Sequence, residues 1–224
     1  NENVVLHQCY LKKIPEVLST FLKTHTQELE RLCETTLAKI PSDCFTFSIL
    51  PSDIGVLFEP LFHHLDQLMV LCPKRRGVWG VNYVHRLFLG KTFDEGVIGW
   101  PQGTPVMCGE NQPEFDLANG DIGLVFGEGD RRRLLFRVIS PEGYSIFRFV
   151  NPVRILNLVP ALALTVHKAQ GSEADQVIIL WPETSNVLPE KLHKESNPDI
   201  NEARMIYTAF TRAKKRVDFI IPAS

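Results

Sequence analysis

A run of short, closely spaced apolar segments in the middle of this 224-residue sequence constrains its fold more than any other feature. Between residues 101 and 152, the segments "TPVMCG", "GDIGLVFG", "RRLLFRVI" and "YSIFRFVN" are separated by turn signals such as "EGD" and "PEGY". Short strands at close, regular spacing predict a small all-β barrel or sandwich in this part of the chain.

The sequence on either side of this stretch has the pattern of alternating strands and helices. "LTVHKAQGSEADQVIIL" (164–180) predicts a strand, a helical segment and a second strand, and "NEARMIYTAFTRAKKRVDFII" (201–221) predicts a helix that leads into a strand. Upstream, one or two helices are predicted for residues 14–39, a short buried strand for 67–73, and a turn entering a helix for 77–90.

Alternating β and α units of this kind imply a parallel sheet. The simplest architecture that accommodates both patterns is an α/β domain interrupted by a β module. We therefore predict an α/β domain built from residues 1–97 and 153–224, with a small inserted β-barrel at residues 98–152.

Composition excludes several classes of protein. Hydrophobic residues make up 44% and charged residues 22% of the chain, as in ordinary globular proteins. No apolar run approaches the roughly 18 residues of a membrane-spanning helix, so no membrane partner is expected. The N-terminus lacks both a Met and the apolar core of a signal peptide, and we expect an excised piece of a longer polypeptide.

The five cysteines are scattered and contain no C-x-x-C pair (Cys9, Cys33, Cys44, Cys72, Cys108). This argues against a disulfide framework and against a zinc site, and for a reducing, cytoplasmic location. No metal-ligating residues are predicted.

Charge alone does not indicate a nucleic-acid-binding protein, because the formal net charge is −2. Local basic clusters occur at 74–76, 131–133 and 212–216. Such clusters are more often solvated surface than phosphate contacts, so by themselves they favour the surface interpretation.

One apparent phosphate-binding motif fails on spacing. "LGKTF" (89–93) ends like a P-loop, with Lys91 in the lysine position. The full motif needs a second glycine five residues before Gly90, where this chain has His85. Nucleotide binding through Lys91 is therefore not expected.

The stretch "TVHKAQGSE" is more informative. It concentrates His167, Lys168, Gln170 and Glu173 at the end of a predicted strand, and ligands of open α/β sheets bind outside the carboxyl ends of strands. The His and Lys could contact a phosphate backbone, and the Gln and Glu a ribose. The alternative is a solvated turn through Gly171, and the residues alone leave both possibilities open.

Arg212 lies between a predicted amphipathic helix and a predicted strand. An arginine held there can present its planar, always charged guanidinium to a phosphoryl group, and such a finger contributes about 10³–10⁵ in rate. The alternative is a surface arginine in a basic run, which this segment alone favours.

Taken together and in this order, "LTVHKAQGSEADQVII" and "IYTAFTRAKK" resemble motifs V and VI of superfamily I helicases. The sequences of these two motifs most resemble those of RecD, the alpha subunit of bacterial exodeoxyribonuclease V, and its stand-alone relatives. "VLCPKRRGVWGVNYVHRLF" (70–88) and "NGDIGLVF" (119–126) resemble two further segments of that family. The resemblance covers residues 68–221.

The resemblance implies a second RecA-like motor domain with a barrel insert, the C-terminal half of an ATP-dependent 5′→3′ DNA helicase of recombinational repair. It implies ATP with Mg²⁺ as cofactor, the Mg²⁺ ligands being on a preceding motor domain. Implied partners are single-stranded DNA, that motor domain, and the nuclease-helicase and third subunits of exodeoxyribonuclease V. The chain alone is then expected to be inactive. The alternative is a non-catalytic nucleic-acid-binding or assembly module derived from a helicase half.

The resemblance also assigns roles by position. Arg212 matches the arginine that senses the γ-phosphate, with Gly171 and Glu173 on the nucleotide side of motif V. Single-stranded DNA is expected to contact Thr165, His167, Lys168, Gln170 and Arg75.

One position departs from the family pattern, and two others are expected to have no ligand role. Leu11 stands where the family has a second γ-phosphate arginine, so either Lys12 or Lys13 replaces it or the site is weakened. Asn119 and Asp121 are expected to shape a turn of the barrel, because Asn-Gly is a strong hairpin signal.

Overall fold

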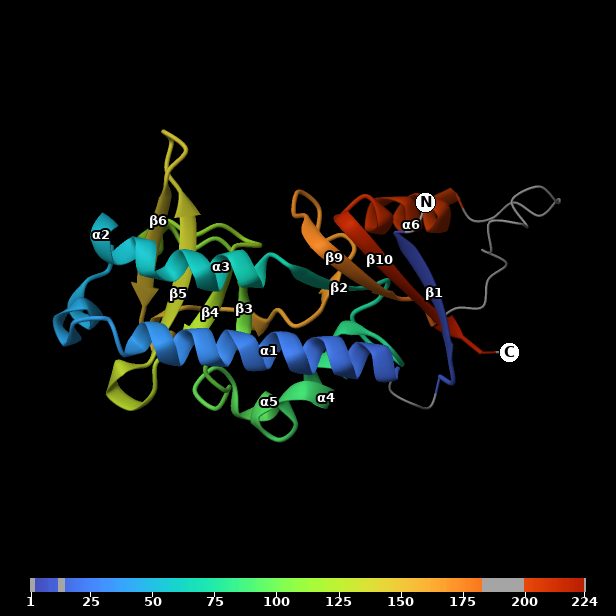
Figure 1. The fold of residues 1–224 in the computed structure, drawn as a ribbon, viewed down its shortest axis with the longest axis horizontal. Helices are drawn as coiled ribbons and strands as arrows, with labels where there is room; N and C mark the ends of the chain where they lie inside the picture. Colours follow the sequence, from blue (N-terminus) through green and yellow to red (C-terminus); the bar gives the residue numbers. More distant parts are fainter. Residues whose placement is uncertain (1–2, 12–14, 183–199, 224) are drawn as a thin grey trace. The chain divides into compact units, whose positions relative to one another are not determined.

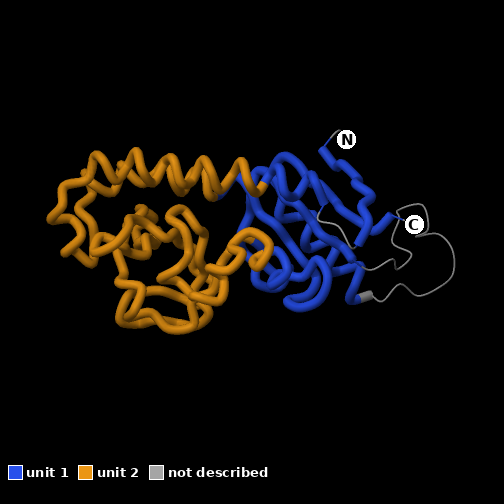
Figure 2. Tube along the Cα trace, turned by 90° about the horizontal axis from the view of Figure 1, so that it is seen from below, with its two compact units in different colours: residues 1–21, 66–84, 163–224 blue, residues 22–65, 85–162 orange. Residues whose placement is uncertain are grey.

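The computed structural model describes residues 3–11, 15–182 and 200–223. The chain forms two compact units (Figure 2). Unit 1 contains residues 1–21, 66–84 and 163–224, and unit 2 contains residues 22–65 and 85–162. Lys12 and Lys13 lie outside the described residues.

Unit 1 is built on the predicted parallel sheet. Its five strands lie in the order β1-β10-β9-β2-β8, and every neighbouring pair is parallel (Figure 1). They are β1 (Val4–Cys9), β2 (Leu68–Cys72), β8 (Leu164–Thr165), β9 (Ala174–Leu180) and β10 (Ala213–Pro222). The predicted α/β class is confirmed.

Helices cover both faces of β10 in this sheet. Phe210, at the end of α6 (Ile200–Phe210), contacts the ring of Phe219, with centroids 5.4 Å apart. On the other face, Phe21 of α1 (Glu16–Leu37) lies against the Arg216 guanidinium, 5.7 Å from ring centroid to Cζ. A strand covered on both faces needs apolar residues without alternation. The buried run Val177–Leu180 of β9 has this pattern.

Unit 2 contains an antiparallel sheet with strand order β6-β5-β4-β3-β7. Its strands are β3 (Pro105–Cys108), β4 (Ile122–Phe126), β5 (Arg133–Ile139), β6 (Ser145–Val150) and β7 (Leu158–Pro160). The four predicted strand segments are thus confirmed as β3 to β6, whereas β7 was not predicted.

The predicted closed barrel is not seen in the described part of the chain, where this sheet is open. A segment far away in the sequence covers its β6 edge. The Leu50 amide donates to the Phe147 carbonyl (3.0 Å), and the Phe149 amide donates to the Ser48 carbonyl (3.2 Å). Because residues 48–50 satisfy the backbone groups of this edge, the sheet does not need to close on itself.

The division between the two units differs from the predicted boundaries at 97/98 and 152/153. Residues 22–65 and 85–97 belong with the antiparallel sheet. For residues 22–65 the reason is one shared hydrophobic cluster, in which Leu29 and Cys33 of α1 join aromatic residues of the loops and of the sheet. Those aromatic residues are Phe45, Phe58, Phe62, Phe126, Phe147 and Phe149.

The other helices of the two units are short. They are α2 (Ser52–Gly55), α3 (Glu59–Leu65), α4 (Val81–Leu89) and α5 (Thr92–Glu95). Single 3₁₀ turns occupy Ser42–Thr46, Val56–Phe58, Pro113–Phe115, Gly129–Arg131 and Pro152–Arg154. The predicted helices at 14–39 and 77–90 are confirmed as α1 and α4.

The helical segment predicted between β8 and β9 is wrong. Residues 166–171 form consecutive turns that include Gly171 at φ +89°, and residues 172–173 lead into β9 without regular secondary structure. Thr165 is level with Cys72, whereas Gln176 is level with Leu68. Because β9 begins two residues before Gln176, at Ala174, the chain must return by about six residues of β-strand length, roughly 20 Å, before β9 begins. Eight helical residues would span only about 12 Å.

Candidate functional site

Arg212 lies half-buried at the junction of α6 and β10, and its hydrogen-bond partners among the described residues belong to unit 1. Its Nε donates to the Thr208 carbonyl (3.2 Å) and its Nη2 to the Thr211 hydroxyl (3.2 Å). Its Nη1 donates to the Ser172 carbonyl (3.3 Å), in the turn that precedes β9. The guanidinium therefore joins the end of α6 to this turn.

The pairing of β9 with β10 brings the other predicted nucleotide residues to the same place. Ala213 pairs with Ala174, and the Ala174 amide donates to the Arg212 carbonyl (2.9 Å). Glu173 forms a long ion pair with Lys214 (3.9 Å), and both side chains are about half exposed. Gly171, Glu173 and Arg212 thus form one cluster at the amino ends of β9 and β10.

A second group of predicted residues lies at the carboxyl ends of β2 and β8. Thr165 is the partner of Cys72, and the Val166 amide donates to the Cys72 carbonyl (3.2 Å). Arg75 follows three residues after Cys72 and is exposed. The exposed side chains of His167, Lys168 and Gln170 follow Thr165 in the turn.

The structure therefore separates the predicted site residues into two groups. Thr165 and Arg212 lie at opposite ends of the strands, roughly 20 Å apart by strand register, and Lys168, Gln170 and Gly171 follow one another along the turn between them. The turn 166–173 connects them: it begins beside Thr165 and ends beside Arg212. A molecule bound at one end and a molecule bound at the other would contact the same eight-residue segment.

The loop 73–80 leaves little backbone for anion binding. Free amides at a helix N-terminus commonly bind phosphate. Here the first two amides of α4 are already used, because Val81 donates to the Lys74 carbonyl (3.1 Å) and Asn82 to the Arg75 carbonyl (3.0 Å). A phosphate at this end of the sheet would therefore be bound by side chains such as Arg75 and Arg76, which are exposed.

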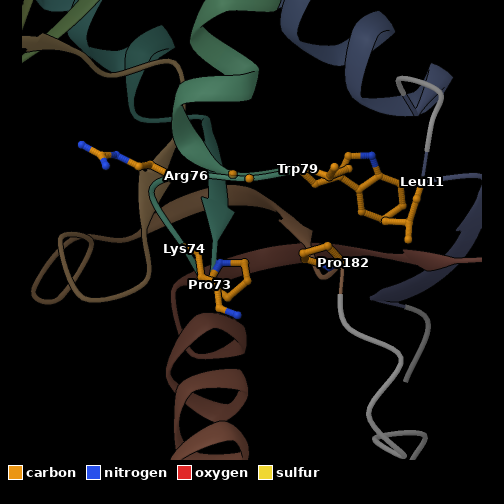
Figure 3. Close-up of a pocket in the computed structure, with 9 residues that line it drawn as sticks. Leu11, Pro73, Lys74, Arg76, Trp79 and Pro182 are labelled. Carbon is orange, nitrogen blue, oxygen red and sulfur yellow. The ribbon is translucent and has the colours of Figure 1, made fainter.

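A small pocket of about 240 Å³ lies beside this loop, at the carboxyl ends of β1, β2 and β9. Its lining includes Leu11, Pro73, Trp79 and Pro182 (Figure 3). Trp79 is fully buried and has a left-handed backbone (φ +54°), which is unusual for a bulky residue. The sequence analysis did not anticipate this pocket.

Leu11 and Arg212 lie at opposite ends of β10. Leu11 follows Cys9, which pairs with Pro222 at one end of β10, whereas Arg212 precedes the other end. A ten-residue strand spans roughly 33 Å. Position 11 therefore does not adjoin the cluster around Arg212.

Two motifs of unit 2 that resemble phosphate-binding segments, 131–133 and 89–93, have a structural explanation. Arg132 donates to the carbonyls of Val97, Ile98 and Trp100 at 2.6–3.1 Å, and Arg133 donates to the Phe45 carbonyl. Gly90, in turn, ends α4 with φ +54°, so Lys91 follows a helix end and not a phosphate-binding loop.

The predicted turn at Asn119 and Asp121 is confirmed. The Asp121 carboxylate accepts a hydrogen bond from the Ala118 amide (2.7 Å), and Gly120 between them has φ +102°. The five cysteines carry free thiols.

A cluster around Asp218 escaped the sequence analysis. Asp218 is fully buried and accepts hydrogen bonds from His7, Gln176 and Arg216. Burial raises the pKa of this carboxyl group, but the hydrogen bonds and the Arg216 charge outweigh burial and hold its pKa below the ordinary value. A single acidic residue in the apolar run "RVDFII" was the signal that could have revealed it.

The side chains around Arg212 suit an anion better than a metal. Arg212, Lys214 and Lys215 are cationic, and the two carboxylates beside them, Glu173 and Asp175, each pair with one of these lysines. Among the described residues, no group of three or more His, Cys, Asp or Glu side chains could hold a metal ion. No helix among the same residues is long and apolar enough to cross a bilayer.

Comparison with known proteins gives these clusters a family context. Residues 160–220, which contain the turn 166–173 and Arg212, match the UvrD-like helicase C-terminal domain. The chain is 35% identical over 158 residues to the RecBCD enzyme subunit RecD of Mycolicibacterium smegmatis, covering 68% of this chain and 25% of that protein. The chain is related to the C-terminal part of RecD-like superfamily I helicases.

A RecD-like relative outside the RecBCD enzyme also matches. The ATP-dependent RecD2 DNA helicase of Deinococcus radiodurans is 30% identical over 159 residues, covering 66% of this chain and 19% of that protein. The chain thus spans about a quarter or less of the length of these relatives. The crystal structure of Bacteroides Pif1 bound to ssDNA is 17% identical and covers 78% of this chain and 46% of that one. Its TM-score of 0.39 is too low to carry an argument.

Proposed function

We propose that this RecD-like chain is the second motor domain of an ATP-dependent 5′→3′ DNA helicase that acts in recombinational repair. Arg212 contacts the γ-phosphate of ATP, with Gly171 and Glu173 beside the nucleotide. Thr165, His167, Lys168, Gln170 and Arg75 contact single-stranded DNA. A preceding motor domain supplies the phosphate-binding loop and the Mg²⁺ ligands, so the chain alone does not hydrolyse ATP.

The observation that carries this proposal is the contact of Arg212 with the turn 166–173. The guanidinium donates to the Ser172 carbonyl at one end of the turn, and Thr165 joins the carboxyl end of β2 at its other end. An arginine pulled towards a phosphate would leave Ser172 and change the restraints on this turn. Nucleotide binding at Arg212 and DNA binding at Thr165 to Lys168 would be coupled through eight residues.

Charge supports the assignment of the two ends. Arg212 and Lys214 at the amino ends of β9 and β10 present cations to a phosphoryl group. Lys168, Arg75 and Arg76 at the carboxyl ends of β8 and β2 are exposed and suit a phosphate backbone. Association with nuclease-helicase and third subunits, as in a RecBCD-type enzyme, is part of the proposal.

A non-catalytic assembly module was the alternative, and Leu11 was the feature that favoured it. Leu11 lies at the opposite end of β10 from Arg212 and is not part of the cluster around Arg212 that supports the motor proposal. The motor function is therefore the one that the geometry supports best.

The test is ATP hydrolysis stimulated by single-stranded DNA, measured on the full-length protein that contains this chain. Arg212→Ala is expected to lower turnover by about a thousandfold, as loss of an arginine finger does, with DNA affinity retained. Arg204→Ala, which removes an exposed arginine of the same helix, is the matched control and should leave turnover unchanged. Equal rates for Arg212→Ala and the unaltered protein would refute the assignment.

A further inference from the structure

Strand β10 contains one residue more than the strand beside it, directly after Arg212. Ala213 pairs with Ala174, and Arg216 pairs with Gln176, so three steps along β10 match two steps along β9. The extra residue forms a β-bulge at positions 214–215. Bulges of this kind re-aim the side chains beside them and are frequent next to active sites.

The bulge decides which face of the sheet Arg212 lies on. Side chains of a strand alternate between the two faces, and one inserted residue reverses the alternation. Arg212 bonds the Thr208 carbonyl of α6, and α6 packs on the face of Phe219. Arg216 lies on the other face, over Phe21 of α1. Without the bulge, Arg212 would point to the face of Arg216, away from α6.

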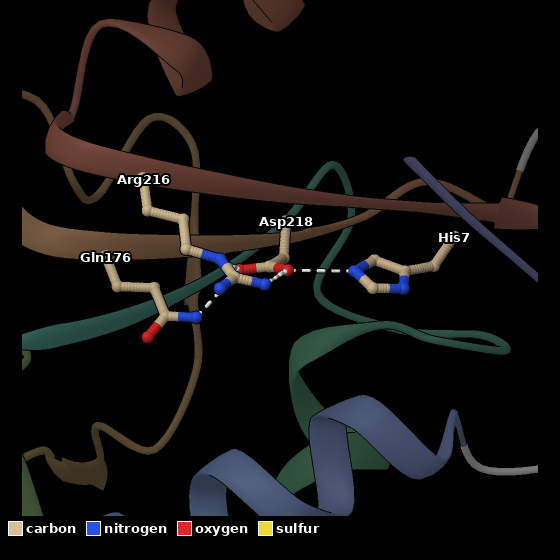
Figure 4. Close-up of polar contacts among 4 residues, drawn as sticks. All are labelled: His7, Gln176, Arg216 and Asp218. Carbon is tan, nitrogen blue, oxygen red and sulfur yellow. Dashed lines mark hydrogen bonds and ion pairs between the residues drawn. The ribbon is translucent and has the colours of Figure 1, made fainter. Parts of the chain in front are cut away.

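A buried carboxylate fixes β10 immediately after the bulge. Asp218 accepts from Arg216 through both oxygens (2.7 and 2.8 Å) and from the Gln176 amide of β9 (2.7 Å) (Figure 4). The third partner is Nε2 of His7 on β1, at 2.8 Å. Because a carboxylate only accepts, this nitrogen carries the proton. Asp218 thus ties β10 to both of its neighbours.

These contacts allow only one register of β10. If β10 slid by one residue, Asp218 would turn to the other face, away from Gln176 and His7. A buried charge without partners is strongly unfavourable. At the other end of the bulge, Arg212 is fixed by α6 and by the hydrogen bond from the Ala174 amide. The extra residue therefore lies between two fixed positions, Arg212 and Asp218.

We propose that Asp218, held by Gln176 and His7, is a positioning residue for Arg212: it locks the register that directs Arg212 towards the turn at Gly171 to Glu173. Asp218 acts through Arg212 and touches no substrate. This inference rests on the proposed role of Arg212 in ATP hydrolysis. It adds a structural requirement that the helicase assignment alone does not contain.

The test is a double-mutant cycle on the full-length protein, with ATP turnover, the KM for ATP, DNA affinity and thermal unfolding as readouts. Asp218→Asn places an amide NH₂ among three donors and weakens the lock. It is expected to lower kcat about tenfold to a hundredfold, the cost of a misplaced catalytic group, with KM and DNA affinity within about twofold. In an Arg212→Ala background, Asp218→Asn should cause no further loss, because its effect passes through Arg212.

Two further variants keep the test decisive. Ile220→Ala removes a fully buried side chain of the same face of β10, two residues beyond Asp218, and controls for loss of stability alone. It should lower the melting temperature without the selective fall in kcat. If Asp218→Asn does not fold, Gln176→Leu removes a single donor and should show the same pattern more weakly.

The possible outcomes separate the two proposals. If Arg212→Ala alone leaves turnover unchanged, the proposed function fails. If Arg212→Ala is impaired but Asp218→Asn and Gln176→Leu leave kcat unchanged, or lower it equally in both backgrounds, the positioning role fails and the proposed function stands.

Discussion

The arginines of two basic triplets, 131–133 in unit 2 and 74–76 in unit 1, have different surroundings. In unit 2, Arg132 and Arg133 donate to backbone carbonyls and hold the loop 97–100 and the turn at Phe45 against the sheet. In unit 1, Arg75 and Arg76 are exposed at a strand end, whereas Arg212 is half-buried and, like Arg132, donates to backbone carbonyls. A basic triplet in the sequence therefore does not indicate a ligand. The acceptors that the fold supplies decide whether an arginine stabilises the protein or remains for a partner.

The prediction with the largest expected effect tests the structural role of Arg132 in unit 2. Arg132→Ala leaves three carbonyls without their donor and should destabilise unit 2 by about 2–3 kcal/mol, the usual cost of such losses. Arg131→Ala, an exposed neighbour, is the control and should have little effect. Chemical unfolding measures both. A loss of DNA affinity by Arg132→Ala without a loss of stability would contradict the structural role.

A smaller expected effect is a difference between the two units in how their stability depends on pH. The His25 ring in unit 2 stacks on His64, and burial, with repulsion from His64, lowers its pKa from 6.5 to about 3. Between these values the unfolded chain binds a proton that the folded unit does not. Unit 2 should therefore lose stability as pH falls from 6.5 towards 3, by about 1.4 kcal/mol per pH unit from this group.

Unit 1 should lose the contribution of Asp218 to its stability only at a lower pH. The Asp218 pKa is held below its ordinary 3.8, so its contribution to stability is present above that pH and lost only as pH falls through the lower folded value. Amide hydrogen exchange, read separately for the two units, measures both windows. His25→Phe keeps a stacked ring and should flatten the response of unit 2. An unchanged pH dependence in this variant would show that His25 is not the group responsible.

Most of the elements could be predicted from the sequence because their signals are local. The strands β3 to β6 lie between turn residues, and α1 has apolar positions at helical spacing over six turns. The open edge of the antiparallel sheet could not be predicted, because residues 48–50, which cover it, lie about a hundred positions before β6. The turn 166–173 has a polar, helix-like composition, but the distance it spans is set by the pairing of β8 with β2.

The same limit applies to the site. Arg212 and the turn before β9 were singled out from short motifs, and the pairing of Ala213 with Ala174 brings these two segments together. The contacts of Asp218 with His7 and Gln176 join residues 211 and 42 positions apart, and no local pattern records them. The bulge after Arg212 has no sequence signal, because it depends on the register of two strands.

The most direct test of the central claim is whether the two ends of the turn 166–173 have separable functions. DNA affinity and DNA-independent ATP turnover would be measured on the full-length protein for Lys168→Ala and Arg212→Ala. Lys168→Ala is expected to weaken binding to single-stranded DNA and to reduce its salt dependence by about 0.7 in the logarithmic slope, with basal turnover retained. Arg212→Ala is expected to abolish turnover and retain DNA affinity. Loss of both properties in each variant would contradict the account, because it would mean that the two ends form one site.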